Sequence, residues 1–203
     1  MTEAADYRYP DGTVRAMLDG EHVTAPTRLA LRQRLADAPE VHSDILGDRA
    51  VTLAAVCARL IPQPDRNPPI DVAATIHARL ATGIGDGWRY ADLPPDQEAL
   101  RRGLDGIDET ARAMFAAPFA GLPVGDRDSV LRAVQSGTPA GTIWRELPPA
   151  RWFEELLAAA VEAYYAHPLA QEEIGYAGMA DAPGWALIGL AEREAREPAE
   201  TVI

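Results

Sequence analysis

Apolar residues recur at helical spacing along much of the chain. The clearest run lies in residues 95–116, where apolar positions follow one another at intervals of four, three, four and three: Leu100, Leu104, Ile107, Ala111 and Met114. This spacing places them on one face of an α-helix. The pattern therefore predicts that residues 95–116 form the longest helix of the chain.

Two glycines interrupt this predicted helix, at positions 103 and 106. Within a helix Gly is about 1 kcal/mol less favourable than Ala. Glycine inside a strong helical pattern is typical of a place where another part of the molecule comes very close. We therefore expect a neighbouring backbone to pass close to Gly103 and Gly106.

A second broad apolar stripe follows Pro148 and Pro149. Pairs of apolar residues recur there every four positions: Trp152/Phe153, Leu156/Leu157, Ala160/Val161 and Tyr164/Tyr165. The pairs predict a helix that Pro168 stops or kinks. Because the stripe is two residues wide, one row suits the core and the other is available to a partner.

Shorter patterns predict further helices at residues 27–36, 48–61, 71–81 and 126–135, with Asp71 capping the third of these. Prolines punctuate the connections, and Pro10-Asp11-Gly12 is a turn signal. The fold class predicted is all-α, a single irregular multi-helix domain of five to seven helices with proline-rich connections. We expect an extended N-terminal arm over residues 1–25, the helical domain over 26–190, and a solvated tail over 191–203.

The charge balance is acidic, with 31 acidic against 19 basic residues and a formal net charge of −12. A nucleic-acid-binding protein needs dense basic side chains to displace the counterions of phosphates. The basic residues here form only short groups, so we expect no nucleic-acid partner. No stretch approaches the roughly 18 apolar residues of a membrane span, so we expect no direct membrane insertion.

Candidate metal and nucleophile residues are sparse. None of the four histidines lies three or four positions from another, and one cysteine permits neither an internal disulfide nor a cysteine-based zinc site. Cys57 lies in the apolar run VTLAAVCARLI, which predicts a small buried hydrophobic residue. We expect no metal site and no catalytic residue in this chain.

Phosphate-binding and hydrolase motifs are missing as well. The run Gly83-Ile84-Gly85-Asp86-Gly87 follows a predicted helix rather than a strand, and its third glycine comes one residue too early for a dinucleotide fingerprint. The sequence contains no lysine and no Gly-x-Ser-x-Gly. Carboxylate chemistry remains open as an alternative, through Glu154, Glu155, Glu172 or Asp181.

Paired aromatic residues, a His-Pro and three glycines come together at 164–185, YYAHPLAQEEIGYAGMADAPGW. Aromatic side chains bury much area with a polar handle, and glycines let a backbone approach a surface closely, so this composition favours contact with a partner. His167, at a predicted helix end, is expected to satisfy terminal carbonyls as a partly positive ring. The candidate partner-binding residues are Trp88, Tyr90, Tyr164, Tyr165, His167, Pro168, Tyr176 and Trp185.

Three motifs in this part of the chain carry a resemblance: Tyr164-Tyr165-x-His167-Pro168, Gly175-Tyr176-x-Gly178 and Gly184-Trp185-x-x-Ile188-Gly189. Upstream, Leu60-Ile61-Pro62 and Leu104-Asp105 fit as well. Together they resemble the gluconate 2-dehydrogenase subunit 3 family over roughly residues 48–190.

The resemblance implies an accessory subunit rather than an enzyme in its own right. In that family the small chain pairs with a large FAD-dependent dehydrogenase of the glucose-methanol-choline oxidoreductase type, which acts on sugars, sugar acids or glycosides. FAD and the catalytic residues then belong to the partner, so no cofactor is expected in this chain. Some complexes add a cytochrome c subunit as electron acceptor, and the small subunit is thought to help its partner fold and be exported.

Export signals are not visible in the sequence. The Arg101-Arg102 pair lies in a predicted helix, and MTEAADYRYPDGTVRAM has no apolar signal region. We expect a cytoplasmic protein, or a periplasmic one if a signal has been removed. Two other functions stay open: a stand-alone helical adaptor, and the small carboxylate-dependent enzyme.

Overall fold

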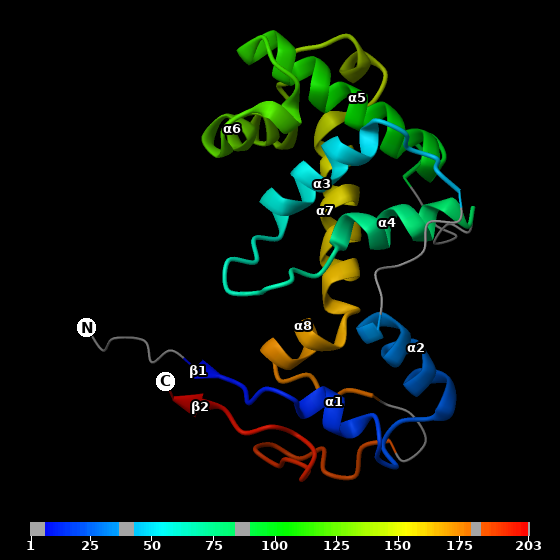
Figure 1. Cartoon of the computed structure of the whole chain (residues 1–203), viewed down its shortest axis with the longest axis vertical. Helices are drawn as coiled ribbons and strands as arrows, with labels where there is room; N and C mark the ends of the chain where they lie inside the picture. The colour runs from blue at the N-terminus through cyan, green and yellow to red at the C-terminus, as the bar shows by residue number, and fades with distance from the viewer. Residues whose placement is uncertain (1–6, 37–42, 84–89, 180–183, 203) are drawn as a thin grey trace. The chain divides into compact units, whose positions relative to one another are not determined.

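A computed structural model of the protein describes residues 7–36, 43–83, 90–179 and 184–202 (Figure 1). The chain forms two compact units. The first, the central unit, is Ala38–Tyr164, and the second, the terminal unit, combines Met1–Asp37 with Tyr165–Ile203.

The central unit contains the helices that the sequence pattern predicts after residue 40. They are α3 (Arg49–Leu60), α4 (Val72–Ala81), α5 (Asp96–Phe115), α6 (Val124–Gln135) and α7 (Pro149–Tyr165), with 3-10 turns η1 (Phe119–Gly121) and η2 (Ile143–Arg145). Asp71 caps α4 as expected, since its Oδ1 accepts a hydrogen bond of 2.8 Å from Ala74 N. The all-α prediction is confirmed.

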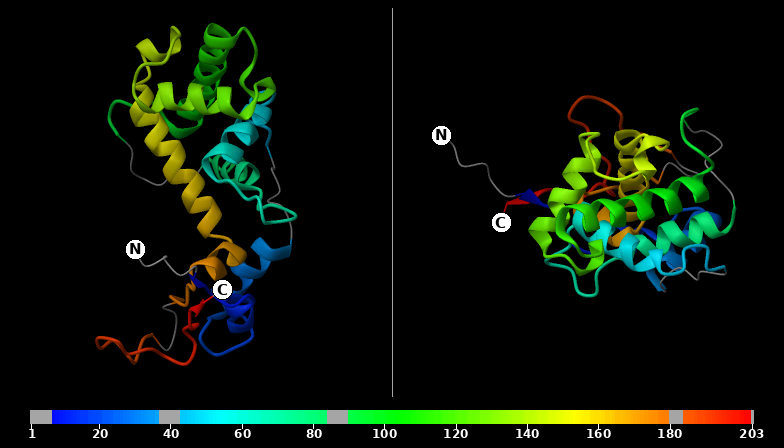
Figure 2. Two further views of the ribbon diagram at one scale, coloured as in Figure 1. Left: turned by 90° about the vertical axis from the view of Figure 1, so that its left-hand side faces the viewer. Right: turned by 90° about the horizontal axis from the view of Figure 1, so that it is seen from above.

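Helix α5 is the central element of this unit. It contacts α3, α6 and both 3-10 turns, and Figures 1 and 2 show α6 beside it. The apolar face read from the sequence is buried at Leu100, Leu104, Ile107 and Ala111, whereas Met114 near the end of the helix is exposed. The spacing of apolar residues thus identified the buried face of the helix correctly.

The two glycines of α5 lie beneath two indole rings. A Cβ on Gly103 would stand 1.8 Å from the ring of Trp152, and one on Gly106 would stand 2.6 Å from the ring of Trp144. The rings lie 5.5 Å apart between centroids at an interplanar angle of 59°. The expectation of a close approach was therefore right, but that of a neighbouring backbone was wrong, because side chains fill the space.

Each indole also donates a hydrogen bond to α5. Trp152 Nε1 lies 2.9 Å from Ala99 O, and Trp144 Nε1 lies 2.9 Å from Thr110 Oγ1. A buried indole N–H without an acceptor would be costly, so these bonds fix how each ring lies on the helix.

Glu109 of α5 holds the 3-10 turn η2 in place. Glu109 accepts hydrogen bonds from Thr142 N at 2.9 Å and Ile143 N at 3.2 Å, which hold η2 and with it Trp144 near α5. These backbone hydrogen bonds lower the pKa of Glu109.

Two arginines of α3 make bidentate ion pairs with aspartates of α5 and α6. Arg49 pairs with Asp105 of α5 at 2.7 and 2.9 Å, and Arg59 pairs with Asp128 of α6 at 2.7 and 3.1 Å. Such paired, planar contacts fix orientation better than single ones.

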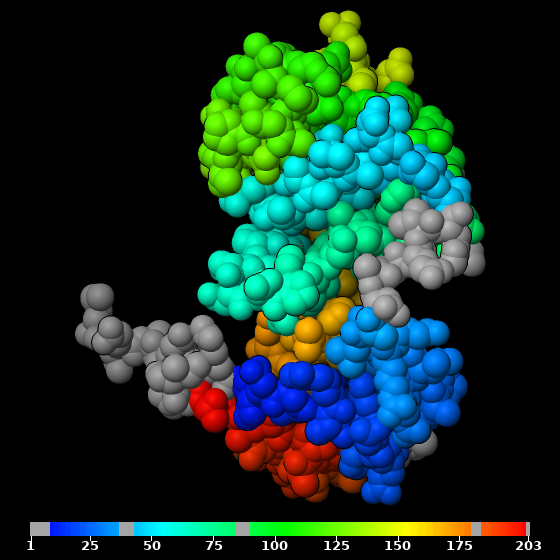
Figure 3. All heavy atoms as spheres, viewed as in Figure 1, coloured from blue at the N-terminus to red at the C-terminus, as the bar shows by residue number. Residues whose placement is uncertain are grey.

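The terminal unit is built from both ends of the sequence. Its elements are β1 (Tyr7–Arg8), α1 (Thr13–Met17), α2 (Ala25–Ala36), α8 (Pro168–Glu173) and β2 (Thr201–Val202). Strands β1 and β2 pair antiparallel, with Tyr7 opposite Val202 and Arg8 opposite Thr201. In Figure 3 the blue N-terminal and red C-terminal residues of this unit adjoin.

The arm expected to be extended contains a helix, and the tail expected to be solvated pairs with this arm, although most of its described residues are exposed. The arm contains α1, whose Val14 and Met17 join a small core with Leu18, Val23, Leu31, Ala177 and Met179. The tail pairs with the arm through β2, and its Arg196 side chain is only 3% exposed. Both segments are short, and their strands pair with each other from opposite ends of the chain. A pattern within either segment alone does not predict this pairing.

The contact between Gly103 and the indole ring gives a stability prediction. We expect Gly103→Ala to destabilise the protein by about 1–3 kcal/mol in urea unfolding, because overpacking outweighs the gain in helix propensity. The matched control is Gly125→Ala in α6, where nothing lies within 4 Å of the added Cβ and a gain of up to about 1 kcal/mol is expected. Equal effects of the two substitutions would contradict the packing described here.

Candidate functional site

The candidate partner-binding residues divide by exposure. Tyr165, Tyr176 and Trp185 are exposed, and all three belong to the terminal unit. Tyr164 and Pro168 are buried, so their side chains belong to the interior and not to a contact surface. The remaining two aromatic candidates lie in residues 84–90.

Tyr90 of the central unit is half-buried, and the guanidinium of Arg151 lies 3.8 Å from the centre of its ring. Trp88 lies outside the described residues, as does most of the 83–90 segment. Tyr90 is therefore a partly covered aromatic side chain that already carries a cation on one face.

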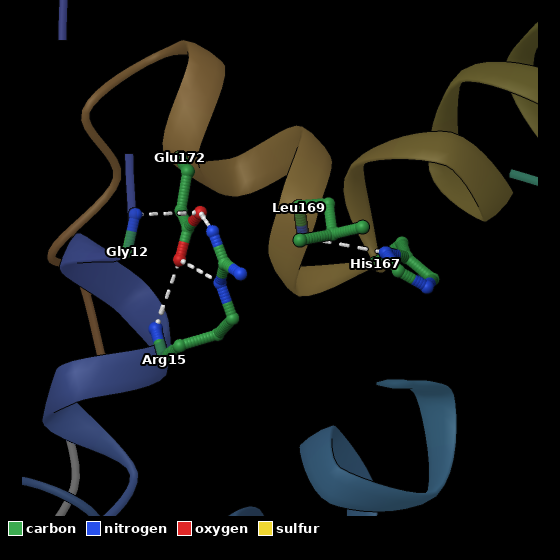
Figure 4. Close-up of polar contacts among 5 residues, drawn as sticks. All are labelled: Gly12, Arg15, His167, Leu169 and Glu172. Atoms are coloured by element: carbon green, nitrogen blue, oxygen red, sulfur yellow. Dashed lines mark hydrogen bonds and ion pairs between the residues drawn. The ribbon is translucent and has the colours of Figure 1, made fainter. Parts of the chain in front are cut away.

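His167 has a different role from the one expected. Its Nδ1 accepts a hydrogen bond of 3.3 Å from Leu169 N and so caps the start of α8 (Figure 4). In this contact Nδ1 is the acceptor and therefore carries no proton. We expected a partly positive ring that satisfies carbonyls at the end of α7; the structure shows His167 at the start of a new helix, because Pro168 begins α8 at a position that proline favours.

Glu172 forms the most connected polar cluster of the terminal unit. Its carboxylate accepts hydrogen bonds from Gly12 N and Arg15 N, each at 3.0 Å, and from Arg15 Nη2 at 2.9 Å (Figure 4). The two backbone N–H groups belong to the first turn of α1, where helical donors lack partners within the helix. The side chain of Glu172 is 4% exposed, so this contact ties α8 to α1 in the interior.

Opposing effects set the protonation of Glu172. Burial raises its pKa, but hydrogen bonds from the Arg15 side chain and from the backbone N–H groups of Arg15 and Gly12 lower it more, so the pKa lies below the usual range. The group is therefore ionised at neutral pH and is held by donors of its own chain. It is unsuited to act as a general acid.

Two other carboxylates proposed for catalysis, Glu154 and Glu155, belong to the central unit. Glu154 of α7 pairs with Arg151 at 2.6 Å on an exposed surface, and Glu155 beside it is half-buried. Asp181 lies outside the described residues. Among the residues that the structure does describe, no three His, Cys, Asp or Glu side chains come together as a metal site would require.

Sequence reasoning missed an exposed apolar row that follows Trp185. Leu187 is 44% exposed, Ile188 is 84% exposed and Leu190 is fully exposed. The available signal was the run GWALIGL, which has no polar side chain and yet lies between loop residues.

Cys57 is buried on α3, as the sequence predicted. Burial raises the pKa of its thiol to about 12, and the negative charge of Asp71 acts in the same direction. Since the thiolate is the reactive form, the geometry assigns Cys57 to packing.

Within the described ranges, none of the helices has both the length and the apolar character needed to cross a membrane.

Comparison with known proteins gives one family. The model of the family described as gluconate 2-dehydrogenase subunit 3 matches residues 48–184, about two thirds of the chain. The matched range covers α3 to α8. No curated protein and no solved structure matches the chain.

The cluster around Glu172 predicts a pH-dependent stability. We expect Glu172→Gln to destabilise the protein by about 2 kcal/mol at pH 7 in urea unfolding, because hydrogen bonds to a charged group are lost. A carboxyl group whose pKa is lowered by folding stabilises the folded protein at pH values above its pKa in the unfolded chain. This stabilisation is lost as the pH falls through the pKa of the group in the folded protein. The difference in the free energy of unfolding between wild type and variant should therefore become smaller below about pH 4.

Glu154→Gln is the control for this measurement. Its exposed pair with Arg151 should contribute less than about 1 kcal/mol at any pH. A Glu172→Gln variant as stable as this control at pH 7 would show that the carboxylate does not hold α1 to α8.

Burial of Cys57 predicts a slow thiol. Iodoacetamide at pH 8 should leave the folded protein unmodified over hours and label it rapidly in urea, as mass spectrometry would show. Rapid labelling of the folded protein would contradict the burial described above.

Proposed function

The chain belongs to the gluconate 2-dehydrogenase subunit 3 family, and from this membership we propose that it is the small, non-catalytic subunit of an FAD-dependent oxidoreductase complex. The partner is a large subunit of the glucose-methanol-choline type that acts on a sugar, sugar acid or glycoside. FAD is bound in that partner. The present chain binds the large subunit and stabilises it. A cytochrome c or another acceptor takes the electrons onward.

The family match over residues 48–184 is the observation that carries this proposal. The family description names a subunit, so a hetero-oligomeric dehydrogenase is the setting in which such a chain works.

Two features of the structure support a binding role. Among the described residues, the carboxylates of Glu109 and Glu172 each accept hydrogen bonds from two backbone N–H groups of this chain. Such contacts give these two side chains a structural role. Exposed aromatic side chains, in contrast, are typical of protein interfaces, and Tyr165, Tyr176 and Trp185 are of this kind.

Co-purification tests the proposal. The tagged chain is expressed with a glucose-methanol-choline-type flavoprotein from the same genome, and the eluate is examined by absorbance and by mass. We expect a yellow complex of fixed stoichiometry that reduces a dye when a sugar or sugar acid is added. The flavoprotein expressed alone should be less soluble or less active.

The opposite result would be a colourless chain and a flavoprotein that is equally soluble and active without it. That outcome would replace the proposal by a stand-alone adaptor.

A further inference from the structure

The loop between α8 and β2 carries the most exposed apolar row among the described residues. Figure 2 shows it as the orange-red coil that projects from α1 and α8 of the terminal unit. Leu187, Ile188 and Leu190 follow one another there. Apolar side chains exposed together in this way mark an interaction site or a liability for aggregation.

Hydrogen bonds within the loop hold its backbone. Glu194 Oε1 accepts from the N–H groups of Ala186 and Leu187, and Glu192 Oε2 accepts from Gly189 N at 2.9 Å. A segment that adds a strand to a partner's sheet must offer free N–H groups. The N–H groups of Ala186, Leu187 and Gly189 are already used, so the loop is better suited to recognition through its side chains.

Arg196 orders the base of the same loop. Its Nη2 donates to Gly184 O at 2.6 Å, its guanidinium lies 4.3 Å from the centre of the Trp185 ring, and it pairs with Glu194 at 2.9 Å. An apolar row on an ordered loop loses little conformational freedom when it binds.

Charge indicates the chemistry of the partner surface. Residues 184–203 hold four glutamates and two arginines. The hydrogen bond from Ala186 N lowers the pKa of Glu194, so that carboxylate stays ionised at neutral pH. Arg196 is paired with Glu194, which leaves Arg193 as the one exposed basic side chain of residues 184–202 beside four glutamates. The border of the row is therefore acidic on balance, and basic side chains on the partner would complement it.

We propose that Leu187, Ile188 and Leu190 insert into an apolar pocket, bordered by arginine or lysine side chains, on the large oxidoreductase subunit. The inference rests on the proposed function, because the large subunit is the occupant to which it commits. The row follows the matched range, which ends at residue 184, so the family match does not itself assign it a role.

A binding measurement on the complex tests this contact. The dissociation constant between this chain and the flavoprotein is measured for wild type and for the double variant Ile188→Asn with Leu190→Asn. We expect binding at least about tenfold weaker, as for residues at the centre of an interface. Both side chains are exposed, and circular dichroism with the melting temperature verifies that the variant folds.

Leu29→Asn is the matched control. Leu29 is 60% exposed on α2 of the same unit, and its substitution should change the dissociation constant by less than about twofold. The acidic border also predicts slower association as salt rises from 50 to 500 mM, because charge steering is screened.

Three outcomes would overturn the inference. If wild type and the double variant bind the flavoprotein equally, the proposed function stands and the contact lies elsewhere. If the control weakens binding as much as the double variant, the effect is not specific to the row. If the double variant instead abolishes self-association in analytical ultracentrifugation and leaves flavoprotein binding intact, the row joins copies of this chain.

A wild-type chain that fails to bind the flavoprotein at all would instead remove the proposed function, and this inference with it.

Discussion

The packing of two indole rings on a helix that lacks Cβ atoms organises the central unit. Gly103 and Gly106 leave the backbone of α5 open, and Trp152 and Trp144 occupy the space. The rings bring α7 and η2 onto α5, although both follow it in sequence by more than twenty residues. Any larger residue at Gly103 would displace a ring and with it a whole element.

The terminal unit depends on one carboxylate in a comparable way. Glu172 binds Gly12 N across 160 residues of sequence, and β1 pairs with β2 across almost the whole chain. Contacts between such distant residues carry a cost in loop-closure entropy. The buried charge satisfies donors at the start of α1, which is too short to be stable by itself.

The sequence allowed the long helices to be predicted because their signals are local. Apolar spacing located α5, and the side chain of Asp71 marked the start of α4. Helix α1 was missed because its five residues carry no local pattern of sufficient length, and its order comes from Glu172. The capping role of His167 was missed for a related reason: it depends on a second helix that begins immediately after the first.

In the terminal unit, charged side chains make hydrogen bonds within the chain, whereas a row of apolar side chains is exposed. Glu172, Glu194 and Arg196 are charged, yet their hydrogen bonds go to their own chain. Burying a fully exposed Leu or Ile side chain is worth about 1.5–3 kcal/mol. Leu187 is 44% exposed, Ile188 84% and Leu190 fully, so covering the row would gain about 3–7 kcal/mol. That gain approaches the stability of a whole domain, and it exceeds what surface ion pairs provide. A partner that covers this row would gain more from it than from any charged group of the unit.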